Sequence, residues 1–314
     1  MKNLAKSFLI YIFPILLLVL WIETGLHSVR NSYSQKKILL EEHLTEHEVL
    51  ILGNSLPWHG INPGLISARA FNLSMVSQSL FYDLQFVARY IRRMPALKAV
   101  IVCVDYTSLE DEITLSPEYW RSFFYERFFG FPLESEKFAW NIMRFSLIKL
   151  YGGEKTLSLA RNLFRDHLDY EQLENGFAPR INPGYLTNDA EARKRVNFLH
   201  SCMDSSAISR NSAHLREIIK QLRTRGVIPV LVSLPVSSGY TLALDQKKLQ
   251  TMQKIIKTIA AESGAAYHNY MFDKRFTTED FFDADHLAIN GAIHFTNILN
   301  LEVIKPLLDT TRPD

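Results

Sequence analysis

The sequence predicts an α/β fold in which a parallel sheet of about five strands, in flavodoxin-like order, is covered by helices on both faces. Short apolar runs, such as EVLIL and KAVIVCV, alternate along the chain with longer segments of helical periodicity. Glycine, proline or a polar residue ends most of these segments. The expected strands are residues 48–52, 70–73, 98–104, 227–234 and 265–268, and the expected helices are 77–94, 211–225, 245–263 and 290–299.

Local signals support each of these elements. The first strand is a short apolar run that ends at Gly53. The first helix has apolar residues three or four positions apart, which form one face: Leu80, Leu84, Val87 and Ile91. Ser77 could cap this helix, and Pro95 follows its end. The two helices after it end at Gly226 and Gly264, as glycine after a helix predicts.

The composition is that of a globular chain with a sizeable core. Its 314 residues suffice for one large domain or two small ones, and 47% of them are hydrophobic. The 35 basic and 33 acidic residues leave a net charge of +2, which gives no reason to expect a nucleic-acid partner. The basic runs Arg92-Arg93 and Arg193-Lys194-Arg195 are interpreted as solvated helix faces.

The two cysteines do not indicate a metal site. Cys103 lies within an apolar strand, and neither it nor Cys202 belongs to a CxxC or Cys/His pattern typical of zinc. We expect two free thiols; a disulfide formed in an oxidising compartment is the alternative. Cysteine usage therefore does not decide the compartment.

The amino-terminal segment predicts a membrane anchor over residues 1–29. Residues 7–22 carry no charge and are almost wholly apolar, and as a helix they span about 24 Å, slightly less than a hydrocarbon core of roughly 30 Å. Lys6 could extend outward to the headgroups, and Trp21 suits the interface. A secretory signal peptide and a buried core helix are the alternatives, but no A-x-A-like cleavage site closely follows the apolar run.

The orientation of this anchor depends on the segments around it. Basic residues before and after the helix are nearly balanced, so the positive-inside rule does not decide the orientation. A very short tail followed by a large domain most often places the tail inside the cell and the domain outside. We therefore expect a single-pass protein of the cytoplasmic membrane whose main domain faces the periplasmic or cell-surface side.

The rest of the chain divides into a linker and one domain. Residues 30–47 are polar and charged and are expected to form a juxtamembrane helix or linker. Residues 48–314 are expected to form the α/β domain, with an inserted helical cap at about 106–207 where the strand–helix alternation breaks. Within the cap, the aromatic stretch at 121–131 either supplies core side chains or forms a surface that lies on the membrane or on a membrane partner.

Ser55 is the first candidate functional residue. It directly follows the first expected strand, in the sequence LGNSLP, and ligands bind at the carboxyl ends of strands in parallel α/β sheets. The small residues Gly53 and Asn54 before it would let backbone amides approach a substrate. A Gly-Asn-Ser tripeptide is also typical of an ordinary turn, so the hypothesis needs a second element.

The second element is the sequence FFDADHLAINGA at 281–292. Asp283 and His286 are three residues apart, so the carboxylate could hydrogen-bond one ring nitrogen and leave the other to take a proton from a serine. In the alternative interpretation, Asp285 caps the last helix and His286 is a surface residue.

The GNS block at 53–55 and the DADH block at 283–286 together resemble those of the SGNH-hydrolase (GDSL-type) superfamily. The chain order also fits, with the nucleophile block first and the acid–base block last, and so does the alternation of strands and helices. The resemblance covers roughly residues 48–105 and 208–300 and leaves out the insertion between them.

This resemblance implies a fold and a mechanism. It implies an SGNH-hydrolase fold with Ser55 as nucleophile, His286 as general base and Asp283 as the acid that orients the imidazole. It implies that neither a metal nor an organic cofactor is needed. Hydrolysis and acyl transfer use the same residues, so both reactions stay open.

The resemblance also implies an oxyanion hole, where the sequence departs from the family pattern. The family uses the serine amide, a glycine of a second block and an asparagine of a third block. Here Ser74 or Ser77 stands at the glycine position, and Asp105-Tyr106 replaces the third block. We expect Asn54, Ser77 and Asp105 to line the oxyanion hole or the pocket.

The carboxylate of Asp105 would repel a developing oxyanion unless it is protonated; its alternative role is to accept hydrogen bonds from backbone amides at the strand end. Losing one oxyanion donor costs about 100- to 1000-fold in rate, so a slow catalyst and an inactive relative both stay open. Two further histidines are less defined. His59 could line the pocket, and His294 is expected on a helix face.

Among SGNH proteins, the chain is similar to a membrane-anchored subset that modifies envelope polymers, such as the protein of D-alanine transfer to teichoic acid and the alginate O-acetylation proteins. This similarity implies an acyl donor, a glycan or polymer acceptor, and work beside a multi-pass membrane O-acyltransferase. Two hypotheses follow. The protein is an extracytoplasmic acyl-ester hydrolase or O-acyltransferase, or it is a non-enzymatic partner built on the same fold.

Overall fold

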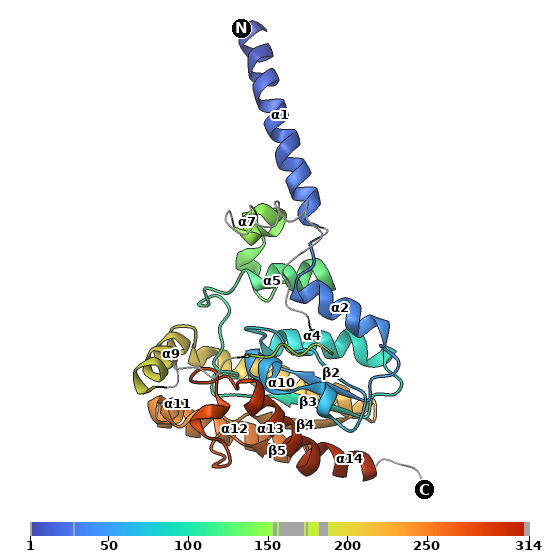
Figure 1. Ribbon diagram of the computed structural model, residues 1–314, viewed down its shortest axis with the longest axis vertical. Coiled ribbons are helices and arrows are strands. Elements are labelled where there is room, and N and C mark those ends of the chain that lie inside the picture. Colours follow the sequence, from blue (N-terminus) through green and yellow to red (C-terminus); the bar gives the residue numbers. More distant parts are fainter. Residues whose placement is uncertain are drawn as a thin grey trace. The chain divides into compact units, whose positions relative to one another are not determined.

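The computed structural model describes residues 2–27, 29–152, 156, 173, 175–181 and 188–310 of the chain (Figure 1). The chain forms two compact units. The smaller unit comprises Met1–Gln35 with Trp120–Glu171, and the larger unit comprises Lys36–Tyr119 with Gln172–Asp314. The larger unit contains the sheet and both candidate blocks.

The sheet has the predicted α/β architecture. Its five strands are all parallel and lie in the order β2-β1-β3-β4-β5, which is the flavodoxin-like order. The strands are β1 (Val49–Leu52), β2 (Ala70–Asn72), β3 (Ala99–Cys103), β4 (Ile228–Ser233) and β5 (Ala266–Asn269). Every expected strand is present, with ends within one residue of the prediction.

The centre of the sheet forms the core of the larger unit. Every residue of β1 and β3 is buried. The two strands pair in register from Val49 opposite Ala99 to Leu52 opposite Val102. This explains the continuous apolar runs in the sequence, because strands covered on both faces have no solvent side to alternate with.

Helices form a layer on each side of the sheet (Figure 1). On one face, α10 (Ile208–Thr224) packs beside α4 (Leu80–Tyr90) and α12 (Gln246–Ser263). Separately, α13 (Ile289–Leu299) packs against α3 (Ser55–Gly60). Crossovers between parallel strands are right-handed. The crossover that contains α3 leads from β1 to β2, which is the opposite direction across the sheet to the other crossovers. The helix α3 therefore lies on the other face of the sheet.

The remaining α-helices described in this unit are α9 (Asp189–Ser201), α11 (Ser238–Ala243) and α14 (Lys305–Thr310), besides α2 (Ser32–Glu42), which begins in the smaller unit. The start predicted for the first sheet helix is wrong. That helix begins at Leu80 with Ser79 at its cap, whereas Ser77 has φ +52°, a left-handed conformation outside a helix. Periodicity placed the apolar face correctly but not the turn that precedes it.

The smaller unit is helical where it is described. It contains α1 (Lys2–Leu26), α5 (Arg121–Phe124), α6 (Ile142–Phe145) and α7 (Leu147–Tyr151). The carboxylate of Glu23 accepts hydrogen bonds from the Ser146 hydroxyl (3.1 Å) and from the first backbone amides of α7, so it joins α1 to α7.

The aromatic stretch at 121–131 lies mainly inside this smaller unit. Phe123, Tyr125 and Phe129 are fully buried, and the Phe124 ring stacks on the Tyr33 ring at 5.1 Å between centroids. The interpretation of these side chains as core aromatics is therefore confirmed. Among the side chains of this unit whose burial is described, the most exposed large apolar one is Trp140, which lies outside this stretch.

The apolar segment at 7–22 lies within α1, as the helical prediction requires. Across the residues that the structure describes, no helix combines the length and the apolar character needed to cross a membrane.

Cys103 and Cys202 are free and buried. The expectation of two free thiols is therefore confirmed. Burial raises the pKa of the Cys103 thiol well above its ordinary value, and the neighbouring carboxyls of Asp83 and Asp105 raise it further.

The turn after β1 depends on Gly53. Its φ of +136° is a conformation that residues with a side chain rarely adopt. A Cβ there would also lie 2.9 Å from both Cys103 Cβ and Pro57 Cγ. The turn that carries Ser55 is thus held between β3 and α3, and glycine is required at its first position.

Gly53→Ala should lower the free energy of unfolding by about 3 kcal/mol or more, because backbone strain and steric overlap act together. Gly226 is a matched control: its φ is +71°, but no atom lies within 4 Å of an added Cβ. Gly226→Ala should cost about 1 kcal/mol. Urea unfolding followed by circular dichroism measures both values, and equal losses would contradict the close packing described for Gly53.

Candidate active site

Ser55, His286 and Asp283 form one hydrogen-bonded line. Ser55 is the first residue of α3, directly after the β1 turn. Its Oγ lies 2.8 Å from Nε2 of His286. Nδ1 of the same ring lies 2.9 Å from both carboxylate oxygens of Asp283. The structure therefore brings Ser55 together with Asp283 and His286, which lie 228 residues or more further along the chain.

The three-residue spacing of the second block folds into a tight turn. Asp283 Oδ1 accepts hydrogen bonds from the backbone amides of Asp285 (3.1 Å) and His286 (2.8 Å). The turn closes where the Phe282 amide donates to the His286 carbonyl at 2.9 Å. The carboxylate is therefore fixed by the backbone before it meets the imidazole, and it holds the ring with Nε2 directed at Ser55.

The alternative interpretation of this block is wrong on both counts. His286 is buried rather than on the surface. Asp285 does not cap the last helix, because Ala288 is the residue before α13. Asp285 is instead 1% exposed and accepts hydrogen bonds from Arg195 Nε at 3.0 and 2.8 Å.

The charges of the line favour an imidazole with a strong affinity for a proton. Burial opposes the charged form of His286, but Asp285 and Asp283 outweigh it and raise the pKa of the ring above its ordinary value. Burial also opposes the charge on Asp283, yet the hydrogen bonds and the charge of His286 hold the pKa of this carboxyl well below its usual range. Asp283 is thus favoured in its ionised form, and His286 is suited to accept a proton.

Asn54 and Asp105 form a second hydrogen-bonded pair beside Ser55. Asn54 caps α3, since its Oδ1 accepts the Leu56 amide at 3.0 Å, and its Nδ2 donates to Asp105 Oδ2. Asp105 Oδ1 accepts the backbone amides of Thr107 (2.8 Å) and Ser108 (3.0 Å) and both of their hydroxyls. The carboxylate therefore has the strand-end role expected as the alternative, and it also orients Asn54 next to the nucleophile.

Ser77, and not Ser74, shares a cavity with Ser55. Its left-handed φ is a conformation that favours glycine, so the backbone has the shape expected for a glycine position. Ser74 is fully buried, and its carbonyl accepts a hydrogen bond from Lys36 Nζ. The Ser55 amide is at the first position of α3, where helical amides have no intrahelical acceptor.

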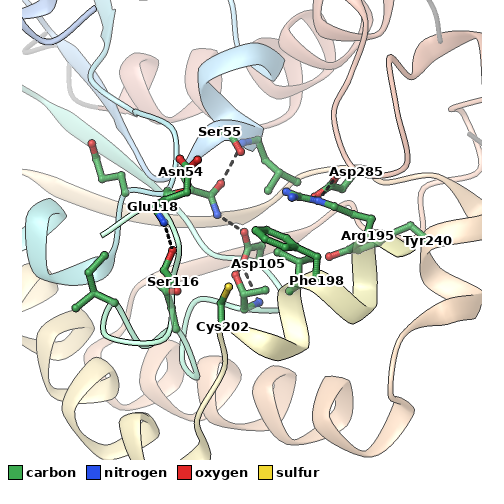
Figure 2. Close-up of a pocket in the computed structure, with 17 residues that line it drawn as sticks. Asn54, Ser55, Asp105, Ser116, Glu118, Arg195, Phe198, Cys202, Tyr240 and Asp285 are labelled. Atoms are coloured by element: carbon green, nitrogen blue, oxygen red, sulfur yellow. Dashed lines mark hydrogen bonds and ion pairs between the residues drawn. The ribbon is translucent and has the colours of Figure 1, made fainter. Parts of the chain in front are cut away.

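The cavity beside Ser55 is small and polar (Figure 2). It offers about 70 Å³ to the centres of water molecules. Besides the predicted residues, it is lined by Asp111, Arg195, Phe198 and Tyr240, which the sequence analysis did not assign to the site. Burial raises the pKa of the Asp111 carboxyl to about 7, and the charges of Asp105 and Glu112 add to this shift.

Arg195 corrects the interpretation of the basic run in which it lies. It is part of α9 and lines the cavity, while its two basic neighbours in the sequence point away and are exposed. Helical periodicity indicated that Arg195 and Phe198 lie on one helix face, because they are three residues apart. The sequence did not reveal what that face would meet.

Asp83 lies fully buried behind the nucleophile turn. It accepts hydrogen bonds from the Gly53 amide and from Gln78 Nε2 (2.6 Å). Burial raises the pKa of this carboxyl to about 7, against the effect of both hydrogen bonds. One side chain of α4 thereby connects the Ser55 turn to the residue after Ser77.

The two remaining histidines have structural surroundings. His59 does not line the cavity; it is buried, its Nδ1 lies 2.6 Å from the Ala178 carbonyl, and its ring contacts the His286 ring edge-on at 5.6 Å. Burial lowers the pKa of His59 to about 3, so it packs against His286 as a neutral ring. His294 lies on α13 with its side chain 42% exposed, as expected for a helix face.

Three side chains of the site have metal-ligating atoms within 4.8 Å of one another: Asp283, Asp285 and His286. Their donor atoms are already used. Nδ1 of His286 faces Asp283, and Asp285 binds Arg195. A cation at this point would have to displace the guanidinium, so the arrangement suits proton transfer better than metal binding.

No protein-family model and no curated protein sequence matches the chain. Among solved structures, the chain is similar to the psychrotrophic esterase EstA from Pseudoalteromonas sp., with 10% identity, a TM-score of 0.42, and coverage of 84% of this chain and 99% of that one. It is also similar to the lipase/acylhydrolase from Enterococcus faecalis (8% identity, TM-score 0.40, coverage 83% and 96%). A third similar structure is TesA (10% identity, TM-score 0.39, coverage 83% and 99%).

Proposed function

We propose that this protein is a serine acyl-ester hydrolase or O-acyltransferase of the SGNH (GDSL-type) superfamily. The observation that carries the proposal is the unbroken hydrogen-bonded line from Asp283 through His286 to Ser55 at the carboxyl end of β1. The hydrogen-bond distances between these three side chains, and the directions in which the pKa values of Asp283 and His286 are shifted, suit nucleophilic catalysis by a serine.

The reaction proceeds through an acyl-enzyme. Ser55 Oγ attacks the carbonyl carbon of an acyl ester while His286 Nε2 takes the hydroxyl proton. His286 then returns this proton to the departing alcohol, which leaves the acyl group on Ser55. Water, or an acceptor hydroxyl, gives its proton to Nε2 and attacks the acyl carbon, and Ser55 regains a proton as it leaves. Asp283 holds the tautomer throughout.

The oxyanion of each tetrahedral intermediate needs hydrogen-bond donors. The Ser55 amide at the start of α3 and the amide of Ser77, a residue that lines the same cavity, are the backbone groups to which we assign this role. The side chain of Asp105 does not oppose the oxyanion as a bare carboxylate would, since Asn54, Thr107 and Ser108 satisfy it.

The size of the cavity favours a short acyl group. The space open to the centres of water-sized groups is only about 70 Å³, which leaves little room for a long acyl chain. Polar side chains line much of the wall, which favours a small or hydroxylated substrate over a long alkyl chain. A short-chain ester of a glycan or envelope polymer meets both conditions.

We further propose that the chain is anchored to the cytoplasmic membrane through α1, with the larger unit on the extracytoplasmic side. Support comes from α1 itself, where large apolar side chains are exposed to solvent over more than two turns: Ile10, Tyr11, Phe13, Ile15, Leu16, Leu17, Leu18, Val19, Leu20 and Trp21. A multi-pass O-acyltransferase in the same membrane would then supply the acyl group or receive it.

Ser55→Ala should lower kcat for hydrolysis of p-nitrophenyl acetate by at least about 1000-fold, because the nucleophile is removed. A fluorophosphonate should form one adduct on Ser55 of the unaltered protein, detected by peptide mass spectrometry. Ser67→Ala, an exposed serine after η1 (Pro63–Leu65), is the matched control and should behave as the unaltered protein. An unmodified Ser55 together with undiminished activity in Ser55→Ala would leave the non-enzymatic partner as the better hypothesis.

The acid limb of the kcat/KM profile should lie above pH 6.5. His286 must be neutral to take the Ser55 proton, and its pKa is raised, so activity falls as the pH drops through that raised value. Asp285→Asn removes a charge 3.3 Å from Nδ1 and should move the limb to lower pH. A limb that stays in place in this variant would contradict the role given to the Asp285 charge.

Membrane association should depend on the apolar surface of α1. Leu16→Lys combined with Leu20→Lys should move the protein from the membrane pellet to the soluble fraction, since each lysine costs about 2.5–3.5 kcal/mol at the centre of a spanning helix. Leu242→Lys is the control, because Leu242 is 80% exposed and belongs to the larger unit. Fractionation with an alkaline carbonate wash measures the distribution, and a soluble unaltered protein would refute the anchor.

A further inference from the structure

We infer that Arg195 is a further catalytic residue, whose guanidinium donates hydrogen bonds to the acyl carbonyl oxygen as it becomes an oxyanion. The inference rests on the proposed function. The hydrogen-bond donor to the oxyanion is then a residue of α9, a helix of the insertion, because the end of β3 does not supply one.

The end of β3 cannot provide an oxyanion donor. The side chain at that position is Asp105, a hydrogen-bond acceptor when ionised. The nearest amide side chain, Asn54, uses one N–H of its Nδ2 to donate to this carboxylate and its Oδ1 to cap α3, so it keeps one N–H and carries no charge. A positively charged donor would therefore come from another part of the cavity.

Arg195 lies on the wall of the same cavity as Ser55 and Ser77 (Figure 2). Among the described residues that line this cavity it is the one cationic side chain, facing four with carboxyl groups. A guanidinium in a small cavity stabilises a developing negative charge more strongly than a neutral donor does.

The guanidinium is fixed by one of its nitrogens and keeps the others available. Nε donates to both oxygens of Asp285, at 3.0 and 2.8 Å, which sets the plane of the group. Arginine has five N–H donors, and the four on Nη1 and Nη2 donate to no acceptor within the described part of the chain. The side chain is 30% exposed, so these groups are open to a substrate.

The charge of Asp285 lowers the electrostatic cost of placing the Arg195 guanidinium in this cavity. Its carboxylate balances the guanidinium before substrate arrives, and it also lies 3.3 Å from Nδ1 of His286. Removing Arg195 alone would therefore have two effects: the loss of a donor from the cavity and the exposure of His286 to an unbalanced carboxylate. The experiment has to separate them.

The test compares Arg195→Met/Asp285→Asn with Asp285→Asn, because both proteins lack the carboxylate and differ only in the guanidinium. With p-nitrophenyl acetate at the pH optimum of each variant, kcat of the double variant should be about 100- to 1000-fold lower, with KM changed by less than about threefold. Affinity for a phosphonate or boronate transition-state analogue should fall by a similar factor. Arg193→Met, on the same helix but exposed, should leave kcat unchanged.

Equal kcat values in the two proteins would overturn the inference and leave Arg195 as the ion-pair partner of Asp285 alone. A loss confined to KM would overturn it too, because the guanidinium would then bind the substrate without stabilising the oxyanion. Arg195→Leu, which also removes the charge and the donors, replaces Arg195→Met in the same comparison if thermal unfolding shows that the methionine variant does not fold. Failure of the proposed function is distinct, since the unaltered protein would then form no fluorophosphonate adduct.

Discussion

The parallel pairing of β1 with β3 is the constraint on which the rest of the site depends. It brings the carboxyl ends of both strands to one edge of the sheet, where Ser55 and Asp105 follow their strands at equivalent points. Gly53 must be glycine because the turn lies against Cys103 at the end of β3. Ser55, the helix-capping residue Asn54 and the carboxylate that orients Asn54 are therefore held in place by backbone geometry.

Several carboxyl groups lie close together at this edge, and each is compensated in a different way. Asp283 faces the imidazole, Asp105 accepts amide and hydroxyl donors, and Asp285 binds Arg195. Asp83, buried behind the turn, has a raised pKa and holds Gly53. This pattern separates the roles of chemically identical side chains: one orients a base, one orients an amide, and one balances a cation.

The insertion contributes to the site instead of only covering it. Arg195 and Phe198 of α9 lie on the wall of the cavity that contains Ser55. Both residues belong to the segment that interrupts the alternation of strands and helices. A cavity closed in part by an inserted helix also limits the room for an acyl group, which ties substrate size to the same helix.

The sequence by itself determined the α/β class, the five strands and the two blocks that carry Ser55, Asp283 and His286, because apolar runs and block spacing are local signals. It did not determine the left-handed turn at Ser77, which helical periodicity cannot distinguish from a first helical turn. Nor did the sequence predict that Arg195 lines the cavity, because it belongs to a basic run that is typical of a solvated helix face. Only the tertiary structure decided these points, because Asp285, the partner of Arg195, is distant in sequence, and which groups face one cavity depends on how the chain packs.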